Sequence, residues 1–150
     1  MTTYQLGNIA QSLVHVGKGI LAADESSPTI KKRFDRINVP STDENRRSYR
    51  EMLFTTQGIE EFISGVILFD ETLRQMAQDG TPLPDVLAKK GIIPGIKVDK
   101  GAKALAGFPG EKITEGLDGL RDRLSSGVSY PMPEINRFRG CVQKRPSAAC

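Results

Sequence analysis

The residues best placed for chemistry are Asp24 and Lys97, because each directly follows a short apolar run. Asp24 comes after 20–23 and Lys97 after 92–96. A lysine leaving a buried strand is partly desolvated, which disfavours its charged form, whereas a nearby carboxylate favours that form. An Asp–Lys pair at strand ends is suited to orienting a substrate or to acid–base catalysis. The same residues could instead form a salt bridge or cap loop backbone, and patterning alone does not separate these hypotheses.

The sequence lacks the residues that other common kinds of catalytic or metal site require. The single histidine, His15, lies in a stretch with helical periodicity and is expected at a helix surface or near its end. Both cysteines lie within 125–150, which excludes disulfides and cysteine metal sites from the rest of the chain. No glycine-rich nucleotide loop, zinc-ligand cluster or Ser/His/Asp grouping is present. On patterning alone, Arg33 and Arg46 are ordinary helix-surface residues.

The elements that would position Asp24 and Lys97 alternate between strands and helices. Strands are predicted at 20–23, 65–69 and 92–96, helices at 3–16, from Ser27 to about Ile37, from Ser41 onward and from Pro84 to Gly91, and a loop at 101–112. Leu117, Leu120 and Leu124 indicate one more helix. Strands that alternate with helices call for parallel β/α units.

Two helix starts carry specific signals. Ser27 is predicted to cap a helix with Pro28 at its first position. Ser41 and Glu44 form the pattern of a capping box, and Tyr49, Met52 and Leu53 are expected on one side of the helix that follows. Because the turn after the first strand lacks the glycines of a phosphate loop, a (β/α)₈ barrel is preferred over an open doubly wound sheet.

Length and charge limit the partners. At 150 residues the chain suggests one domain, and its net charge of +3 arises within residues 125–150. The first 124 residues carry 17 basic and 17 acidic side chains, so they offer no electrostatic footprint for nucleic acid. No apolar stretch approaches the ~18 residues of a membrane span, and the amino terminus lacks the pattern of a secretory signal. We therefore expect a cytoplasmic protein that binds neither nucleic acid nor membrane.

Five motifs, in order and in register, resemble class I fructose-bisphosphate aldolase. They are GKGILAADES at 17–26, ENRR at 44–47, GVILFDETL at 65–73, GIKVDKG at 95–101 and GLDGL at 116–120. The likeness covers residues 1–124. The resemblance implies a glycolytic lyase without a metal or other cofactor, acting on a small sugar phosphate, with homo-oligomers among full-length members. It would cleave fructose 1,6-bisphosphate to dihydroxyacetone phosphate and glyceraldehyde 3-phosphate through a Schiff base.

The resemblance also implies roles for individual residues. Asp24 matches the family's active-site aspartate, which orients hydroxyls and assists proton transfer, and Lys97 matches a lysine that binds substrate without forming the imine. Arg33 matches an arginine associated with substrate phosphate, and Ser26 and Thr29 occupy positions near the same phosphate. Arg46 matches an arginine at the mouth of the site.

Several family features have no counterpart in this sequence. It contains no tryptophan for the Lys-Trp-Arg motif of the fourth strand, no strand with the catalytic glutamate and no strand with the imine-forming lysine. The predicted fold is therefore α/β, an incomplete TIM (β/α)₈ barrel with the first three β/α units only. The domain prediction is an aldolase N-terminal part at 1–124 and a divergent, disordered tail at 125–150.

The expected function is that of an aldolase whose chain is truncated and inactive alone. An alternative is a non-catalytic aldolase fragment that needs a complementary chain. A further alternative keeps the enzyme and makes Lys97 itself the residue that forms the imine.

Overall fold

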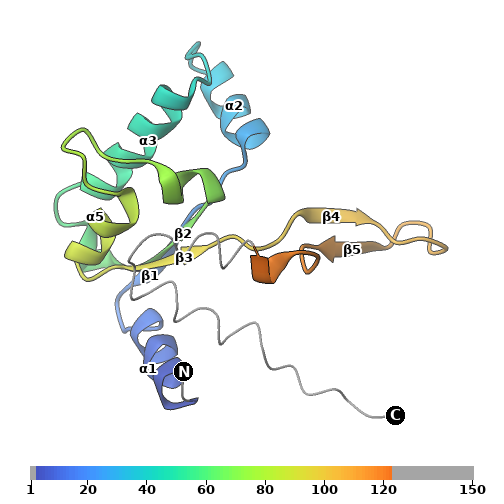
Figure 1. Cartoon of the computed structure of the whole chain (residues 1–150), viewed down its shortest axis with the longest axis horizontal. Coiled ribbons are helices and arrows are strands. Elements are labelled where there is room, and N and C mark those ends of the chain that lie inside the picture. The colour runs from blue at the N-terminus through green and yellow to red at the C-terminus, as the bar shows by residue number, and fades with distance from the viewer. Residues whose placement is uncertain (1–2, 123–150) are drawn as a thin grey trace.

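A computed structural model of the chain describes residues 3–122 (Figure 1). The elements are α1 (Thr3–Leu13), β1 (Gly19–Ala23), α2 (Ser27–Asp35), α3 (Asp43–Thr55), α4 (Ile59–Phe62), β2 (Ile63–Leu68), the 3₁₀ helix η1 (Asp70–Arg74), α5 (Leu83–Lys89), β3 (Ile93–Ile96), β4 (Gly101–Ala104) and β5 (Lys112–Glu115). The three predicted strands and the helices between them are present. The tail predicted at 125–150 and Leu124 lie outside the described residues.

The central sheet consists of three parallel strands in the order β1-β2-β3. Its register pairs Ala22 with Ile67 and Ile67 with Gly95. Two residues further along each outer strand, Asp24 and Lys97 come level with each other at the carboxyl end of the sheet. An α/β fold with a parallel sheet, as predicted, is confirmed, and the register explains why two residues 73 positions apart in sequence can meet.

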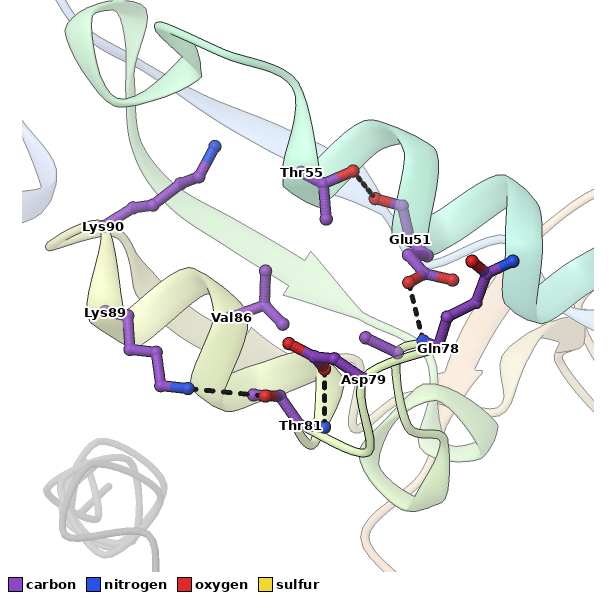
Figure 2. Close-up of a pocket in the computed structure, with 9 residues that line it drawn as sticks. Glu51, Thr55, Gln78, Asp79, Thr81, Val86, Lys89 and Lys90 are labelled. Atoms are coloured by element: carbon purple, nitrogen blue, oxygen red, sulfur yellow. Dashed lines mark hydrogen bonds between the residues drawn. The ribbon is translucent and has the colours of Figure 1, made fainter.

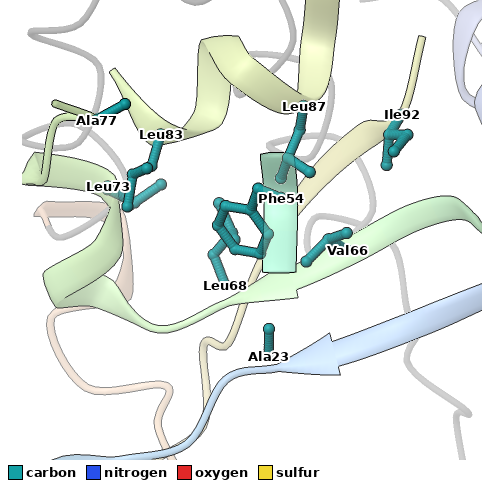
Figure 3. Packing of buried hydrophobic residues seen from close by; sticks show 9 residues of the cluster. All are labelled: Ala23, Phe54, Val66, Leu68, Leu73, Ala77, Leu83, Leu87 and Ile92. Carbon is teal, nitrogen blue, oxygen red and sulfur yellow. The ribbon is translucent and has the colours of Figure 1, made fainter. Parts of the chain in front are cut away.

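Helices cover one face of this sheet, and the hydrophobic core lies between the two layers (Figure 3). Phe54 of α3 and Leu87 of α5 are fully buried, together with Leu68 of β2. Burying one such side chain stabilises the fold by about 1.5–3 kcal/mol. The cluster consists of Ala23, Phe54, Val66, Leu68, Leu73, Ala77, Leu83, Leu87 and Ile92. Its members range from Ala23 in β1 to Ile92, which directly precedes β3, so this core fixes the strands relative to the helices.

The opposite face of the sheet is only partly covered by the described residues. Ile20 is 49% exposed, Ala22 is exposed, and Ile67 and Ile93 are half-buried. β1 and β3 each pair with β2 on one side and have a free edge on the other within residues 3–122. A three-stranded parallel sheet with one open face and two open edges is unusual, because parallel sheets are normally covered on both faces.

Helix α1 lies at the amino ends of the strands (Figure 1). The Ser64 hydroxyl donates a hydrogen bond to the Leu13 carbonyl at 2.6 Å and reaches the Gly19 carbonyl at 3.2 Å. The Leu13 side chain packs so closely on Gly65 that a Cβ there would lie 2.5 Å from it. The predicted helix at 3–16 therefore ends earlier, at Leu13, and Val16 beyond it is 93% exposed.

Both predicted helix caps are displaced by one residue. Ser26, not Ser27, is the N-cap of α2, and its hydroxyl contacts Thr29 Oγ1 at 3.1 Å. Thr42, not Ser41, is the N-cap of α3, where its side chain accepts a hydrogen bond from the Asn45 N–H at 3.2 Å. With Thr42 at the cap, Glu44 falls one position too early for a capping box, so that prediction is wrong.

The buried face of α3 also differs from the predicted one. Met52 is 57% exposed, whereas Arg46, Arg50 and Phe54, spaced four residues apart, form the buried side. Of the apolar stripe expected at Tyr49, Met52 and Leu53, Leu53 packs against the core and Tyr49 is half-buried. Arginine was expected on the solvent face, as is ordinary for that residue. Two buried arginines on one helix face require partners in the protein.

The segment predicted as a loop at 101–112 instead begins an antiparallel hairpin. β4 and β5 pair from Gly101 with Glu115 to Ala104 with Lys112, and the hairpin projects away from the helices (Figure 1). Leu117, expected on a helix, is 81% exposed and precedes a turn at 118–119, whereas Leu120 is buried at the start of helical backbone. Among the helices of residues 3–122, none combines the length and apolar character that crossing a membrane requires.

Replacing Thr42 by alanine should lower the free energy of unfolding by about 1 kcal/mol, since the Asn45 N–H loses its acceptor. Urea denaturation followed by circular dichroism measures the change. Ser41→Ala is the matched control, because the Ser41 hydroxyl makes only a 3.5 Å contact with Arg46. A loss for Ser41→Ala as large as for Thr42→Ala would contradict the assigned cap.

Candidate functional site

The carboxyl end of the sheet brings Lys97 between two carboxylates. Lys97 Nζ lies 2.7 Å from Asp99 Oδ2 and 3.3 Å from Asp24 Oδ2. The side chains of Asp24 and Lys97 are 25% and 28% exposed, so the ion pair remains reachable from solvent. Asp99 is held in turn by the Gly101 N–H, which donates to Asp99 Oδ1 at 2.9 Å. An ion pair at this place agrees with both hypotheses drawn from the sequence, a substrate-binding pair and a salt bridge.

This arrangement favours the charged form of Lys97. The hydrogen bond to Asp99, and to a lesser extent the contact with Asp24, raises the pKa of the Lys97 ammonium, although partial burial acts in the opposite direction. The same contact with Lys97 lowers the pKa of Asp99. Lys97 is thus a fixed positive charge at neutral pH. It is suited to binding an anion or a polarised oxygen, and poorly suited to attacking a carbonyl, for which the neutral amine is needed.

A second group of predicted residues surrounds the start of α2. Ser26 caps the helix, Thr29 lies in its first turn, and the two hydroxyls are in contact. Arg33 lies one turn further on, is 53% exposed, and forms an ion pair with the carboxylate of Glu25, which is 5% exposed. Hydroxyls at the amino end of a helix together with a half-exposed guanidinium are the kinds of group that bind a phosphate.

Arg46 is committed to partners within the protein. Its Nε donates to Glu71 Oε2 at 3.0 Å, its Nη2 to Glu71 Oε1 at 2.6 Å and its Nη1 to the Ser41 carbonyl at 2.7 Å. It also forms an ion pair with Asp43, and its side chain is 10% exposed. Arg46 could therefore contact a substrate only by releasing one of these partners.

Glu71 is shared between Arg46 and a residue that the sequence reasoning missed, Arg50. Arg50 Nη1 donates to Glu71 Oε2 at 2.7 Å. Hydrogen bonds from Arg46, and next from Arg50, outweigh partial burial and lower the pKa of Glu71. The spacing of four residues between the two arginines was the available signal, since it places both on one helix face with Phe54.

Two cavities differ in how they relate to these residues. One of about 220 Å³ contains Lys97 and Asp99 in its lining, together with Phe69, Asp70, Ile96, Val98, Lys100 and Leu120. The other, of about 350 Å³, lies between α3, α5 and the loop that joins η1 to α5 (Figure 2). None of the predicted site residues lines it.

Both carboxylates of the larger cavity already accept hydrogen bonds from other residues of its lining. Glu51 accepts a hydrogen bond from the Gln78 N–H, and Asp79 accepts one from the Thr81 N–H, each at 2.8 Å (Figure 2). We therefore place the candidate site at Lys97. Within residues 3–122, no group of three or more His, Cys, Asp or Glu side chains is arranged to hold a metal ion.

Comparisons with known proteins place this geometry in context. The family model described as "Fructose-bisphosphate aldolase class-I" matches residues 5–130. A probable fructose-bisphosphate aldolase class 1 from Xanthomonas campestris pv. campestris is 59% identical over 124 residues, which are 83% of this chain and 37% of the relative. Fructose-bisphosphate aldolase 2 from Plasmodium berghei is 57% identical over 119 residues, 79% of this chain and 32% of the relative.

A solved structure is similar as well. A fructose-bisphosphate aldolase from Plasmodium falciparum, crystallised with TRAP and a small molecule inhibitor, shares 53% sequence identity and superposes with a TM-score of 0.79. The match covers 84% of this chain and 36% of that one. The chain therefore spans about a third of the length of the relatives it matches.

Asp99→Asn should lower the pKa of the Lys97 ammonium more than Asp24→Asn does, because the shorter contact with Asp99 is the larger cause of the raised pKa. Nitrogen-15 NMR of the lysine side chains measures both titrations. Lys103, exposed on β4, serves as the internal reference. An equal response to the two substitutions would contradict the ranking.

Glu71→Gln should make the free energy of unfolding depend less strongly on pH in the acid range. Because the folded-state pKa of Glu71 lies below its ordinary value of 4.5, its contribution is present above pH 4.5 and is lost as the pH falls through the lowered pKa. Urea denaturation as a function of pH should therefore show a flatter decline below about pH 4.5 in this variant. A decline as steep as that of the unmodified chain would show that Glu71 does not contribute.

Proposed function

The chain belongs to the family of class-I fructose-bisphosphate aldolases, and we propose that it supplies the substrate-binding part of such an enzyme rather than its covalent chemistry. The observation that carries this proposal is the Lys97–Asp24 contact of 3.3 Å at the carboxyl ends of parallel strands. In β/α folds, substrates bind at this end of the sheet. The proposed substrate is fructose 1,6-bisphosphate, cleaved in glycolysis to two triose phosphates.

In this proposal Asp24 and Lys97 contact the reacting part of the sugar. The ammonium of Lys97, kept charged mainly by Asp99, attracts a substrate oxygen that carries negative charge. The Asp24 carboxylate accepts hydrogen bonds from sugar hydroxyls and can take up or return a proton there. Since Asp24 and the substrate compete for the Lys97 ammonium, substrate binding would loosen the ion pair between Asp24 and Lys97.

The phosphate would lie at the amino end of α2. Ser26 and Thr29 offer two hydroxyls there, and the helix contributes partial positive charge. Arg33 is half exposed and lies within reach of solvent, so its guanidinium can pair with a phosphate while Glu25 holds its other side. Arg46 remains a candidate for substrate binding at the mouth of the site, provided that it releases one of its present partners.

The raised pKa of Lys97 argues against the alternative in which Lys97 itself forms the imine. Imine formation starts from a neutral amine, and the two neighbouring carboxylates keep this amine protonated. The remaining family chemistry needs residues that match nothing in this sequence. We propose that a further polypeptide segment supplies them, in the same chain or in a second one.

The structure offers a place for such a segment. One face and both edges of the β1-β2-β3 sheet are open within residues 3–122. The similarity to the solved aldolase structure supports the interpretation that these are the first three strands of a (β/α)₈ barrel. Closing the barrel would pair both edges and bury Ile20, which is now 49% exposed.

Adding the remaining part of the Xanthomonas campestris relative, as a separate chain, should restore cleavage of fructose 1,6-bisphosphate, because it closes the sheet and completes the site. A coupled assay for dihydroxyacetone phosphate measures this. Lys97→Met in the present chain should abolish the restored activity, and Lys103→Met, on the exposed β4, should leave it unchanged. Activity that persists in Lys97→Met, or its absence from the mixture, would refute the proposed role.

Reduction with borohydride in the presence of dihydroxyacetone phosphate should leave Lys97 unmodified, since its protonated amine does not form an imine. Peptide mass mapping after digestion detects the adduct. Recovery of a reduced adduct on Lys97 would instead establish the alternative in which this lysine carries the covalent chemistry.

A further inference from the structure

Arg50 is a charged side chain from which solvent is fully excluded. It lies in the middle of α3 and is 0% exposed, although it is not one of the predicted site residues. Removing a guanidinium from water costs several kcal/mol unless its donors are paired within the protein. The partners of Arg50 therefore indicate what its burial supports.

The hydrogen-bond partners of Arg50 Nη1 and Nη2 lie just beyond two neighbouring strands. Nη1 donates to Glu71 Oε2 at 2.7 Å, and Nη2 donates to the main-chain carbonyl of Glu25 at 3.0 Å. The central carbon of the guanidinium lies 5.9 Å from the centre of the Phe69 ring. Glu25 follows β1, whereas Phe69 and Glu71 follow β2. The side chain thus bridges the carboxyl ends of β1 and β2.

This bridge acts on the residue next to Asp24. β1 ends at Ala23, so Asp24 lies beyond the hydrogen-bonded ladder of the sheet. The peptide carbonyl of Glu25 is held by Arg50, and the Glu25 side chain is held by Arg33. Fixing Glu25 limits the backbone freedom of Asp24. The Asp24 carboxylate can then remain 3.3 Å from Lys97, which directly follows β3, the other outer strand of the sheet.

We propose that Arg50 is a positioning residue, whose guanidinium joins the segments after β1 and β2 and so holds the Asp24 carboxylate beside Lys97. This inference rests on the proposed role of Asp24 and Lys97 in substrate binding, and it concerns how that pair is held. The shape of the side chain is essential, because Nη1 and Nη2 serve different strands. A lysine has one ammonium and cannot reproduce the two-pronged geometry.

The reactivity of Lys97 reports whether Asp24 is in place. Trinitrobenzenesulfonate modifies only neutral amines, and the charged groups facing Lys97 are Asp24 and Asp99, with Asp70 and Lys100 lining the same cavity. In the full chain without substrate, Arg50→Lys should increase the rate of Lys97 modification by roughly three- to tenfold. Peptide mass mapping at successive times measures this rate. Asp24→Asn should give an increase of the same size.

A matched control and a double variant separate positioning from a general loss of stability. Arg47→Lys changes the same type of residue on the same helix, where it pairs with Glu44 and Glu51, and should leave the Lys97 rate unchanged. Arg50→Lys combined with Asp24→Asn should give the rate of Asp24→Asn alone, since no carboxylate remains to be displaced. Arg50→Met, which removes the charge entirely, should raise the rate at least as far as Arg50→Lys.

Clear outcomes overturn the proposal. If Arg50→Lys lowers the free energy of unfolding but leaves the Lys97 rate as in the unmodified chain, Arg50 is structural only. The same conclusion follows if its effect adds to that of Asp24→Asn, or if Arg47→Lys has an equal effect. Because no sugar phosphate is present, these rates do not depend on substrate binding. If the proposed function is wrong, the expected Lys97 modification rates still hold. If those rates are not observed, the restored-activity experiment still tests the proposed function.

Discussion

A positive charge held inside the protein constrains the whole carboxyl end of the sheet. Arg50 has no access to water, so pairing of its donors decides the cost of its burial, and Nη1 and Nη2 are paired to the Glu71 carboxylate and the Glu25 carbonyl. Arg46 shares Glu71 from one turn earlier on α3. Helix α3 is therefore attached to the sheet twice, through apolar contacts around Phe54 and through charged hydrogen bonds at the strand ends.

These two kinds of contact determine different properties of the fold. The apolar cluster holds the helix layer against the strands. It does not fix the exact orientation of the layers, because the hydrophobic effect is non-directional and depends mainly on the apolar area that is buried. The hydrogen bonds of Arg50 are directional, and they fix the positions of individual backbone and side-chain oxygens. A site that needs Asp24 within 3.3 Å of Lys97 depends on the second kind. The cost of burying arginine is understandable where such positional accuracy is needed.

Sequence patterns predicted the sheet and the pair of residues at its end, because short apolar runs followed by charges are typical of buried parallel strands. They failed where polar residues are buried or small residues are exposed. Arg50 was missed because periodicity analysis assigns arginine to solvent, and only its partners on two other segments reveal why it is inside. The β4–β5 hairpin was missed because both its faces are exposed, so it lacks apolar alternation. The caps shifted by one residue, since serine and threonine at adjacent positions compete for the same role.

The surroundings of Lys97 separate electrostatic binding from covalent chemistry. A lysine that forms an imine benefits from a lowered pKa, which arises through burial away from carboxylates or near other cations. Lys97 has the opposite environment, with Asp99 and Asp24 both favouring its charge. The carboxylates that make it a poor nucleophile also hold its ammonium in a defined place. The described residues therefore form a preorganised charge pair, and in the proposed function the covalent centre belongs to a further segment.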